Sequence, residues 1–262
     1  MPYAQVNGQK LFYDDTGGDK PVVIFSHGLL MDHSMFAPQV AALKDRYRCI
    51  SWDERGHGRT AGDTCAPFTY YDSADDLAAL LKHLGIKQAV LAGMSQGGFL
   101  SLRCALTHPD IVRGLVLIDT QAGREDPAKM PGYKQMIDVW ATQGMPDAIA
   151  DTIEGIILAP GWAGGAEWKA KWRTWKPVNV LQSFHTLSER DDISGKLGQI
   201  KAPALVIHGD ADIAIALSLG KALAAGIADA ELAVIPGGGH APNLTHPQLV
   251  NPHIEKFLAK LH

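Results

Sequence analysis

The sequence lacks the features that mark several classes of protein. It has only three cysteines in 262 residues and no C-x-x-C pair, so we expect neither a disulfide framework nor a structural zinc site. Its longest apolar runs, such as Val22-Val23-Ile24-Phe25, are far shorter than the roughly 20 residues that span a bilayer. The first residues have neither the basic nor the apolar region of a secretory signal. We therefore expect a cytoplasmic protein with reduced thiols and no membrane segment.

The sequence also has no strong excess of charge and none of the common cofactor-binding motifs. Lysine and arginine number 24 against 28 acidic residues, a net charge of −4, and they form no basic block, so nucleic acid is not an expected partner. The chain has no G-x-x-x-x-G-K-[ST] and no H-E-x-x-H, and Gly56-His57-Gly58 does not continue as a dinucleotide fingerprint. We expect no cofactor and no metal. The expected partner is a small molecule, and a homodimer is left open.

Short Val- and Ile-rich runs alternate with longer segments of helical period, which is typical of a parallel sheet covered by helices. With 46% apolar and 20% charged residues, the composition is that of a soluble globular protein, and the length favours one α/β domain with an insertion. One helix is predicted to begin at Ser73, with Asp76 completing its cap, and to stop at Gly85. Another is predicted over 96–107. The predicted strands are 10–15, 22–26, 48–52, 89–92, 114–119, 204–208 and 231–235.

The pattern changes between Thr120 and Lys196. Val-rich runs vanish there, and five of the six tryptophans lie in helical stretches of this segment. We interpret 121–196 as a helical cap inserted into a core formed by 1–120 and 197–262. The tryptophans indicate either the cap's own core or the aromatic wall of a substrate pocket. The residues expected to line that pocket are Leu30, Met94, Trp140 and Trp162.

Gly93-Met94-Ser95-Gln96-Gly97 has the pattern G-x-S-x-G. A predicted buried strand precedes it and a predicted helix follows it, so Ser95 falls on a sharp strand-to-helix turn. Glycine two residues before and after the serine avoids side-chain collisions in such a turn. The start of the helix also directs backbone N–H groups toward the place where an oxyanion would form. Ser95 is therefore the candidate nucleophile.

A serine nucleophile needs a base and an acid that orients the base. His240 follows Gly237-Gly238-Gly239 after the last predicted strand, where ligands bind in open α/β sheets. Three carboxylates compete for the role of acid. Asp212 lies beyond the preceding strand and is favoured, Asp210 is better placed to brace the turn, and Asp119 at the end of another strand is a third option.

The order Ser95, Asp212, His240 resembles that of the α/β-hydrolase fold. The segment His27-Gly28, the turn Asp53-Glu54-Arg55-Gly56-His57-Gly58-Arg59-Thr60, the run 200–209 and Gly239-His240-Ala241-Pro242 are similar to further motifs of this family, with Thr60 in the place of a serine. The resemblance covers nearly the whole chain. It implies a mostly parallel, eight-stranded sheet flanked by helices, with an inserted helical cap.

The resemblance also implies roles for single residues. The backbone N–H groups of Leu29 and Gln96 would form the oxyanion hole. His27 would be a structural hydrogen-bonding residue, and Asp53, Arg55 and His57 would hold a turn together. Family members that act as haloalkane dehalogenases or epoxide hydrolases attack with Asp, so the serine implies acyl chemistry.

Ester hydrolysis through an acyl-enzyme is therefore the expected function, in a serine esterase or enol-lactonase-like branch of the family. One alternative is an enol-lactonase or C–C bond hydrolase acting on a small carboxylate-bearing substrate, and thioesterase and perhydrolase activities also stay open. A carboxylate substrate would need a cation on the inner face of the cap. The candidates for that cation are Arg124, Lys171, Arg173 and Arg190. A receptor-like protein with an intact but slow triad is the alternative of another class.

Overall fold

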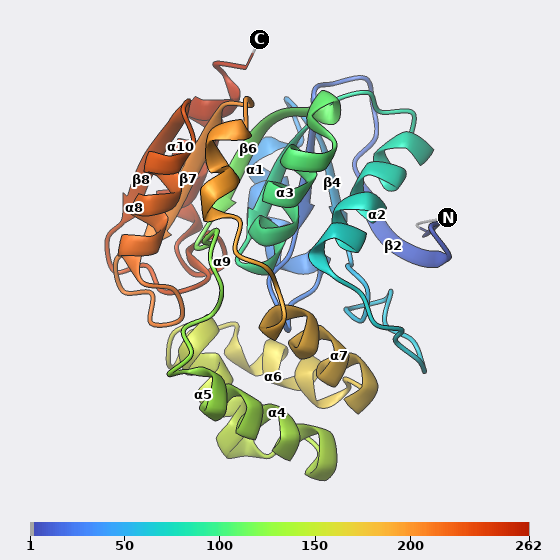
Figure 1. Cartoon of the computed structure of the whole chain (residues 1–262), viewed down its shortest axis with the longest axis vertical. Coiled ribbons are helices and arrows are strands. Elements are labelled where there is room, and N and C mark those ends of the chain that lie inside the picture. Colours follow the sequence, from blue (N-terminus) through green and yellow to red (C-terminus); the bar gives the residue numbers. More distant parts are fainter. Residues whose placement is uncertain (1–2, 262) are drawn as a thin grey trace.

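The computed structural model describes residues 3–261, and its centre is a sheet of eight strands in the order β1-β2-β4-β3-β5-β6-β7-β8 (Figure 1). The pairs β1·β2 and β2·β4 are antiparallel, and every other neighbouring pair is parallel. The prediction of a mostly parallel sheet is confirmed. The strands are β1 (Tyr3–Val6), β2 (Gln9–Asp15), β3 (Val22–Ser26), β4 (Arg48–Trp52), β5 (Ala89–Met94), β6 (Val112–Ile118), β7 (Ala204–Gly209) and β8 (Ala230–Ile235).

Helices cover both faces of the sheet, which explains why its central strands are continuously apolar. All six residues of β5 are buried, as are all six of β7. Helix α2 packs along α3, and α1 contacts α10 (Figure 1). The helices are α1 (Ala37–Leu43), α2 (Tyr70–His83), α3 (Gln96–Thr107), α4 (Met130–Gln143), α5 (Asp147–Ile157), α6 (Gly165–Arg173), α7 (Pro177–Ser188), α8 (Leu217–Gly226), α9 (Pro242–Thr245) and α10 (Pro247–Leu258), with short 3-10 turns η1 (His33–Phe36), η2 (Pro109–Ile111) and η3 (Ser194–Gln199).

The sheet has a switch point at β3. The chain places β4 on one side of β3 and then returns to place β5 on its other side. Loops that leave neighbouring strands in opposite directions open a crevice at the carboxyl edge, where ligands bind in α/β sheets. The loop after β3 and the turn after β5 therefore meet at this edge.

Two details differ from the sequence predictions. Strand β1 was not predicted, because its four residues pair only with β2 and carry too short a hydrophobic pattern to be recognised.

The N-cap of helix α2 is Thr69, four residues before the predicted cap Ser73, and Asp72 completes the capping box. Asp76 instead binds Arg55 through two hydrogen bonds of 2.6 and 2.9 Å. The predicted end of the helix is confirmed by Gly85, which has a φ of 70°.

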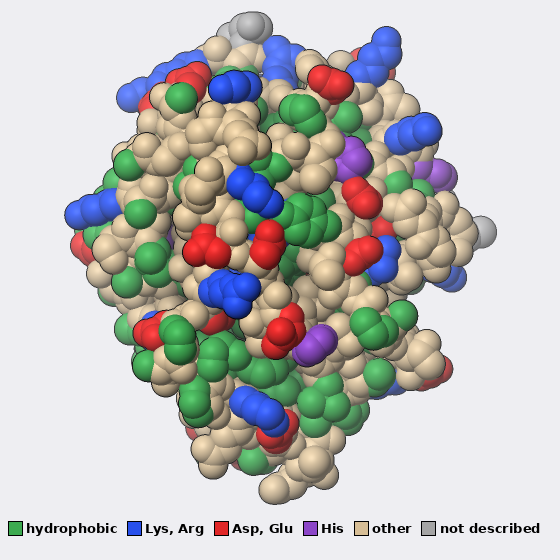
Figure 2. Space-filling view, in the orientation of Figure 1, with side chains coloured by type: hydrophobic (Ala, Val, Ile, Leu, Met, Phe, Trp, Pro, Cys, Tyr) green, Lys and Arg blue, Asp and Glu red, His purple; other side chains and the backbone are tan. Residues whose placement is uncertain are grey.

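Four helices lie between β6 and β7. In Figure 1, α4 to α7 form a layer below the carboxyl edge of the sheet, and the chain enters and leaves this layer through single connections. The division of the chain into a core (1–120 and 197–262) and a cap (121–196) stays a prediction. On the face shown in Figure 2, side chains of both charges are interspersed and apolar side chains gather toward the lower part, over this layer. No helix within residues 3–261 has the length and apolar character needed to cross a membrane.

Candidate active site

Ser95 lies in the turn between β5 and α3, and its backbone is left-handed, with a φ of 49°. A side chain at Gly97 would collide with the backbone oxygen of Ser26, and one at Gly93 would collide with the backbone of Gly97. Glycine at 93 lets β5 approach the start of α3 closely, and glycine at 97 lets α3 approach the end of β3. The Ser95 N–H donates to the carbonyl of Ile118 at 2.8 Å. Packing and hydrogen bonding therefore hold the strained conformation of the serine.

His240 and Asp212 lie beside Ser95. The Nε2 atom of His240, in the loop between β8 and α9, is 3.0 Å from the Ser95 Oγ, and its Nδ1 is 2.8 Å from the Asp212 Oδ2. The other oxygen of Asp212 accepts N–H groups of Ala214 and Ile215 at 2.7 and 3.1 Å. A neutral imidazole with its proton on Nδ1 would donate to Asp212 and accept the Ser95 hydroxyl proton. The structure thus brings together all three residues of the predicted triad.

The two other candidate carboxylates have different surroundings. Asp210 is exposed, and its carboxylate accepts the N–H of Gly237 at 2.7 Å, so it braces the loop that leads to His240. Asp119 is fully buried and accepts the N–H of Gly209 at 2.9 Å. Among the three carboxylates, Asp212 is the one hydrogen-bonded to His240.

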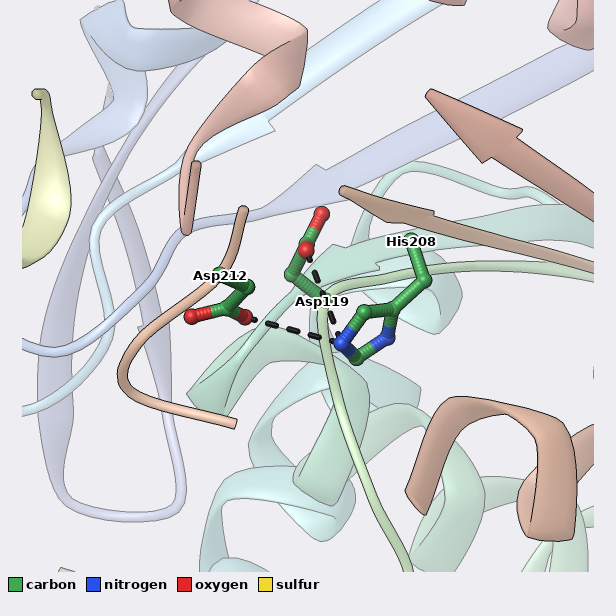
Figure 3. Close-up of side chains that lie close together, drawn as sticks. All are labelled: Asp119, His208 and Asp212. Carbon is green, nitrogen blue, oxygen red and sulfur yellow. Dashed lines mark ion pairs between the residues drawn. The ribbon is translucent and has the colours of Figure 1, made fainter. Parts of the chain in front are cut away.

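Asp119 and His208 nevertheless form a buried cluster with Asp212 of the predicted triad (Figure 3). The Nε2 of His208 lies 3.6 Å from Asp212 and 3.8 Å from Asp119. Burial and the charge of Asp212 raise the pKa of Asp119 well above its usual range. Burial alone would raise the pKa of Asp212 as well, but His240 and the Ile215 N–H outweigh it and lower that pKa. The opposite shifts favour a negative charge on Asp212 and a proton on Asp119.

These three side chains include enough donor atoms for a metal ion, yet both oxygens of Asp212 and the Nε2 of His208 have other partners. Asp212 uses both oxygens for His240 and two backbone N–H groups. The Nε2 of His208 lies 2.9 Å from the carbonyl of Ile215, a bond that requires a proton on that nitrogen. We therefore assign the cluster to orienting Asp212 and not to metal binding.

The predicted oxyanion donors both lie near the serine, since Leu29 lines the same cavity as Ser95 and Gln96 follows it in the chain. Leu29 follows β3 in the loop at the switch point, and Gln96 is the first residue of α3, where a helix leaves its N–H groups unpaired. Within residues 3–261, neither N–H donates to another protein group. Both are therefore free to bind a ligand oxygen at the start of the helix.

Side chains of α6, one of the inserted helices, hold the loop that carries Leu29. Leu30 is left-handed, with a φ of 64°, and its carbonyl accepts the indole N–H of Trp172 at 2.7 Å. Trp172 lies on α6 and is fully buried. The neighbouring Lys171 donates to the Ser34 hydroxyl at 2.6 Å, a few residues further along the same loop. From sequence, Trp172 is only one of five tryptophans in this segment, because its contact spans 142 positions and leaves no local pattern.

A buried polar cluster holds the side chain of Gln96. Its amide nitrogen donates to Glu54, and its amide oxygen accepts the Tyr70 hydroxyl at 3.2 Å. Glu54 is 1% exposed, and its other oxygen has no partner in the part of the chain that the structure describes. Burial raises the pKa of Glu54 to about 8, and the charge of Asp76 adds to the shift. Glu54 is therefore a neutral carboxylic acid near pH 7.

Ser95 opens into an apolar cavity beneath the inserted helices. Leu30 and Met94 line it, as do Ser95 and His240. Tyr133, Phe184 and Glu125 form a further part of the wall. The aliphatic side chains that line it from α4, α5 and α7 are Met136, Ile137, Ile153, Ile156, Ile157 and Leu187.

The prediction that Trp140 and Trp162 line this cavity is wrong. Trp140 lies one turn beyond Ile137 on α4, where its ring packs 6.2 Å from that of Trp175, and it is buried inside the helical layer. Trp162 is half-buried in the connection between α5 and α6, against Gly164. The aliphatic residues of α4 and α5 take the positions that face Ser95, so tryptophan serves the packing of the helices.

None of the four cations considered for a carboxylate substrate lines the cavity. Lys171 binds Ser34 and Asp32. Arg173 pairs with Asp147 at 2.6 Å, and Arg124 is exposed. Arg190 is buried but pairs with Glu125 at 2.9 Å. The wall that faces Ser95 therefore offers no cation to a substrate.

The buried carboxyl of Glu54 makes stability depend on pH. Its pKa is about 8 in the folded protein and 4.5 as the ordinary value, so the folded state holds one more proton between these values and its stability falls as pH rises through this window. Relative to Glu54→Gln, the free energy of unfolding should fall by up to about 1.4 kcal/mol per pH unit. Urea denaturation of both proteins across this window measures the difference. A difference that stays constant with pH would contradict the assignment.

Comparison with known proteins agrees with the fold. The family model described as alpha/beta hydrolase fold matches residues 21–154. A RutD protein of Caulobacter sp. (strain K31), named as a carbamate hydrolase, is 30% identical over 95% of this chain and 96% of its own length. The enol-lactonase of Burkholderia xenovorans LB400 is 28% identical, with a TM-score of 0.90, over 98% of this chain and all of that one. A thermophilic esterase of Thermogutta terrifontis is 28% identical, with a TM-score of 0.88, over all of this chain and 97% of that one. The chain is thus a hydrolase that belongs to the α/β-hydrolase fold family.

Proposed function

We propose that the protein hydrolyses carboxylic esters through an acyl-enzyme formed on Ser95. The observation that carries the proposal is the continuous hydrogen-bonded series from Ser95 through His240 to Asp212, with distances of 3.0 and 2.8 Å. The apolar cavity beside Ser95 supports an ester with an apolar acyl group. The similarity to an esterase of known structure gives further support.

In the first half of the reaction, Ser95 Oγ attacks the ester carbonyl while His240 Nε2 accepts its proton. The negatively charged carbonyl oxygen accepts the N–H groups of Leu29 and Gln96. Asp212 stabilises the imidazolium. The tetrahedral intermediate then breaks its bond to the alcohol oxygen, which takes the proton from His240, and the acyl group stays on Ser95.

Water completes the cycle. His240 accepts a proton from water as the water oxygen attacks the acyl carbonyl, and a second tetrahedral oxyanion forms at the same N–H groups. The bond to Ser95 Oγ breaks, Oγ recovers the proton from His240, and the carboxylic acid leaves. No cofactor enters any step. A carbamate, the substrate class in the name of the RutD relatives, presents the same kind of carbonyl and belongs in the same assay.

Changing Ser95→Ala should abolish turnover. Because the nucleophile is removed, kcat for p-nitrophenyl esters of graded acyl length should fall at least about a thousandfold. Release of p-nitrophenolate measures the rate, with aryl carbamates run in parallel, and circular dichroism checks that the variant is folded. Retained activity in the variant would reject Ser95 as nucleophile. No turnover by the wild-type protein would instead favour lactone, C–C bond or ligand-binding roles.

The choice of acid can be tested with a matched pair of variants. Asp212→Asn removes the charge that orients His240 and should lower kcat about a thousandfold or more. Asp210→Asn changes an exposed carboxylate that contacts only the supporting loop, and should cost less than about tenfold. Both rates come from the same p-nitrophenyl ester assay. A larger loss for Asp210→Asn would assign the role of the orienting acid to Asp210.

The contact from Trp172 should support catalysis and not binding. Trp172→Phe keeps a buried ring but removes the N–H that holds the Leu30 carbonyl, and kcat should fall about tenfold with little change in KM. Trp140→Phe is the control, because Trp140 is equally buried on a neighbouring helix and does not touch the loop. Equal losses in the two variants would show that only the packing of the helices matters.

A further inference from the structure

Apart from His240, one side chain with a formal charge lines the cavity. Among the residues that line it, Glu125 is the one acidic side chain, and none is Lys or Arg. Glu125 lies in the segment between β6 and α4, and its side chain is 9% exposed. The charge that a substrate meets beside Ser95 is therefore negative.

The partner of Glu125 is fixed away from the cavity. Arg190 pairs with Glu125 at 2.9 Å, and its side chain is 1% exposed. Its other nitrogens donate to the carbonyls of Gly123 and Leu187, each at 3.0 Å, and its guanidinium lies 4.2 Å from the ring centre of Phe99. These contacts hold the cation behind the carboxylate, so it is not available to a substrate.

Tyr133 lines the same wall and is affected by the same carboxylate. The pKa of its hydroxyl is raised to about 12. Burial is the main cause, and the charges of Glu125, Asp212 and Asp126 all act in the same direction. An anion at this position is therefore opposed by three carboxylates and by the loss of water.

We propose that Glu125 is a specificity-determining residue that restricts this cavity to esters with an uncharged acyl part and rejects substrates that carry a carboxylate. A carboxylate bound here would be desolvated without a cation and would face another carboxylate. The inference rests on the proposed ester hydrolysis. It separates this chain, by ligand chemistry, from hydrolases that bind acidic substrates.

The first test compares two esters of similar length. In p-nitrophenyl hydrogen adipate the acyl chain ends in a carboxylate, and in p-nitrophenyl methyl adipate that carboxylate is masked as a methyl ester. We expect kcat/KM for the wild-type protein to be at least about a hundredfold higher for the neutral compound, after subtraction of the rate with Ser95→Ala. Equal values would overturn the inference and leave ester hydrolysis standing. If no ester of any kind is hydrolysed, the proposed function itself fails.

Three variants then test Glu125 directly. Glu125→Gln removes the repulsion and leaves Arg190 without its anion, so the ratio of neutral to anionic kcat/KM should fall at least about tenfold. Glu125→Asp keeps the charge and should retain most of the ratio. Glu154→Gln is the matched control, because Glu154 is 10% exposed and pairs with Lys169 on the inserted helices, away from the cavity. Each ratio is measured within one variant, so a general loss of activity cancels. An unchanged ratio in Glu125→Gln would overturn the role of this residue.

Discussion

The close approach of α3 to the ends of β5 and β3 is the constraint on which the rest of the site depends. Only a residue without a Cβ fits at Gly93 and Gly97, and the left-handed Ser95 lies between them. That turn fixes the position of the proposed nucleophile, and it also fixes the start of α3 and therefore the N–H of Gln96. The loops after β7 and β8 supply Asp212 and His240 to a point that this turn has already defined.

Most of the core could be predicted from sequence because its signals are local. Strand β3 and strand β4 follow from their apolar runs, and the turn at Ser95 follows from its glycines. The choice of Asp212 over Asp210 also rested on local position, namely its distance beyond the end of β7. Helix α2 was placed too late because two similar capping patterns occur four residues apart, and the hydrogen bonds at Thr69 decide between them.

The inserted helices were the part that sequence could not resolve. A tryptophan such as Trp140 carries the same helical period whether it faces a ligand or a neighbouring helix, so the pattern could not separate the two. The roles of Glu54 and Trp172 depend on contacts with Gln96 and Leu30, which are 42 and 142 positions away. From sequence, Arg190 is a candidate ligand for a substrate carboxylate, and only the structure shows that it pairs with Glu125 instead.

The hydrogen bond from Trp172 to Leu30 connects the helices that cover the cavity to the loop beside Ser95. Leu30 lies in the loop that carries Leu29, one of the proposed oxyanion donors, while Trp172 belongs to the layer that covers the cavity. A displacement of α6 large enough to separate Trp172 from Leu30 would break this bond and free the left-handed backbone of Leu30. The proposed chemistry at Ser95 would then be confined to the arrangement in which α6 holds this loop. The same bond would make the covering helices part of the catalytic apparatus and not only a barrier to solvent.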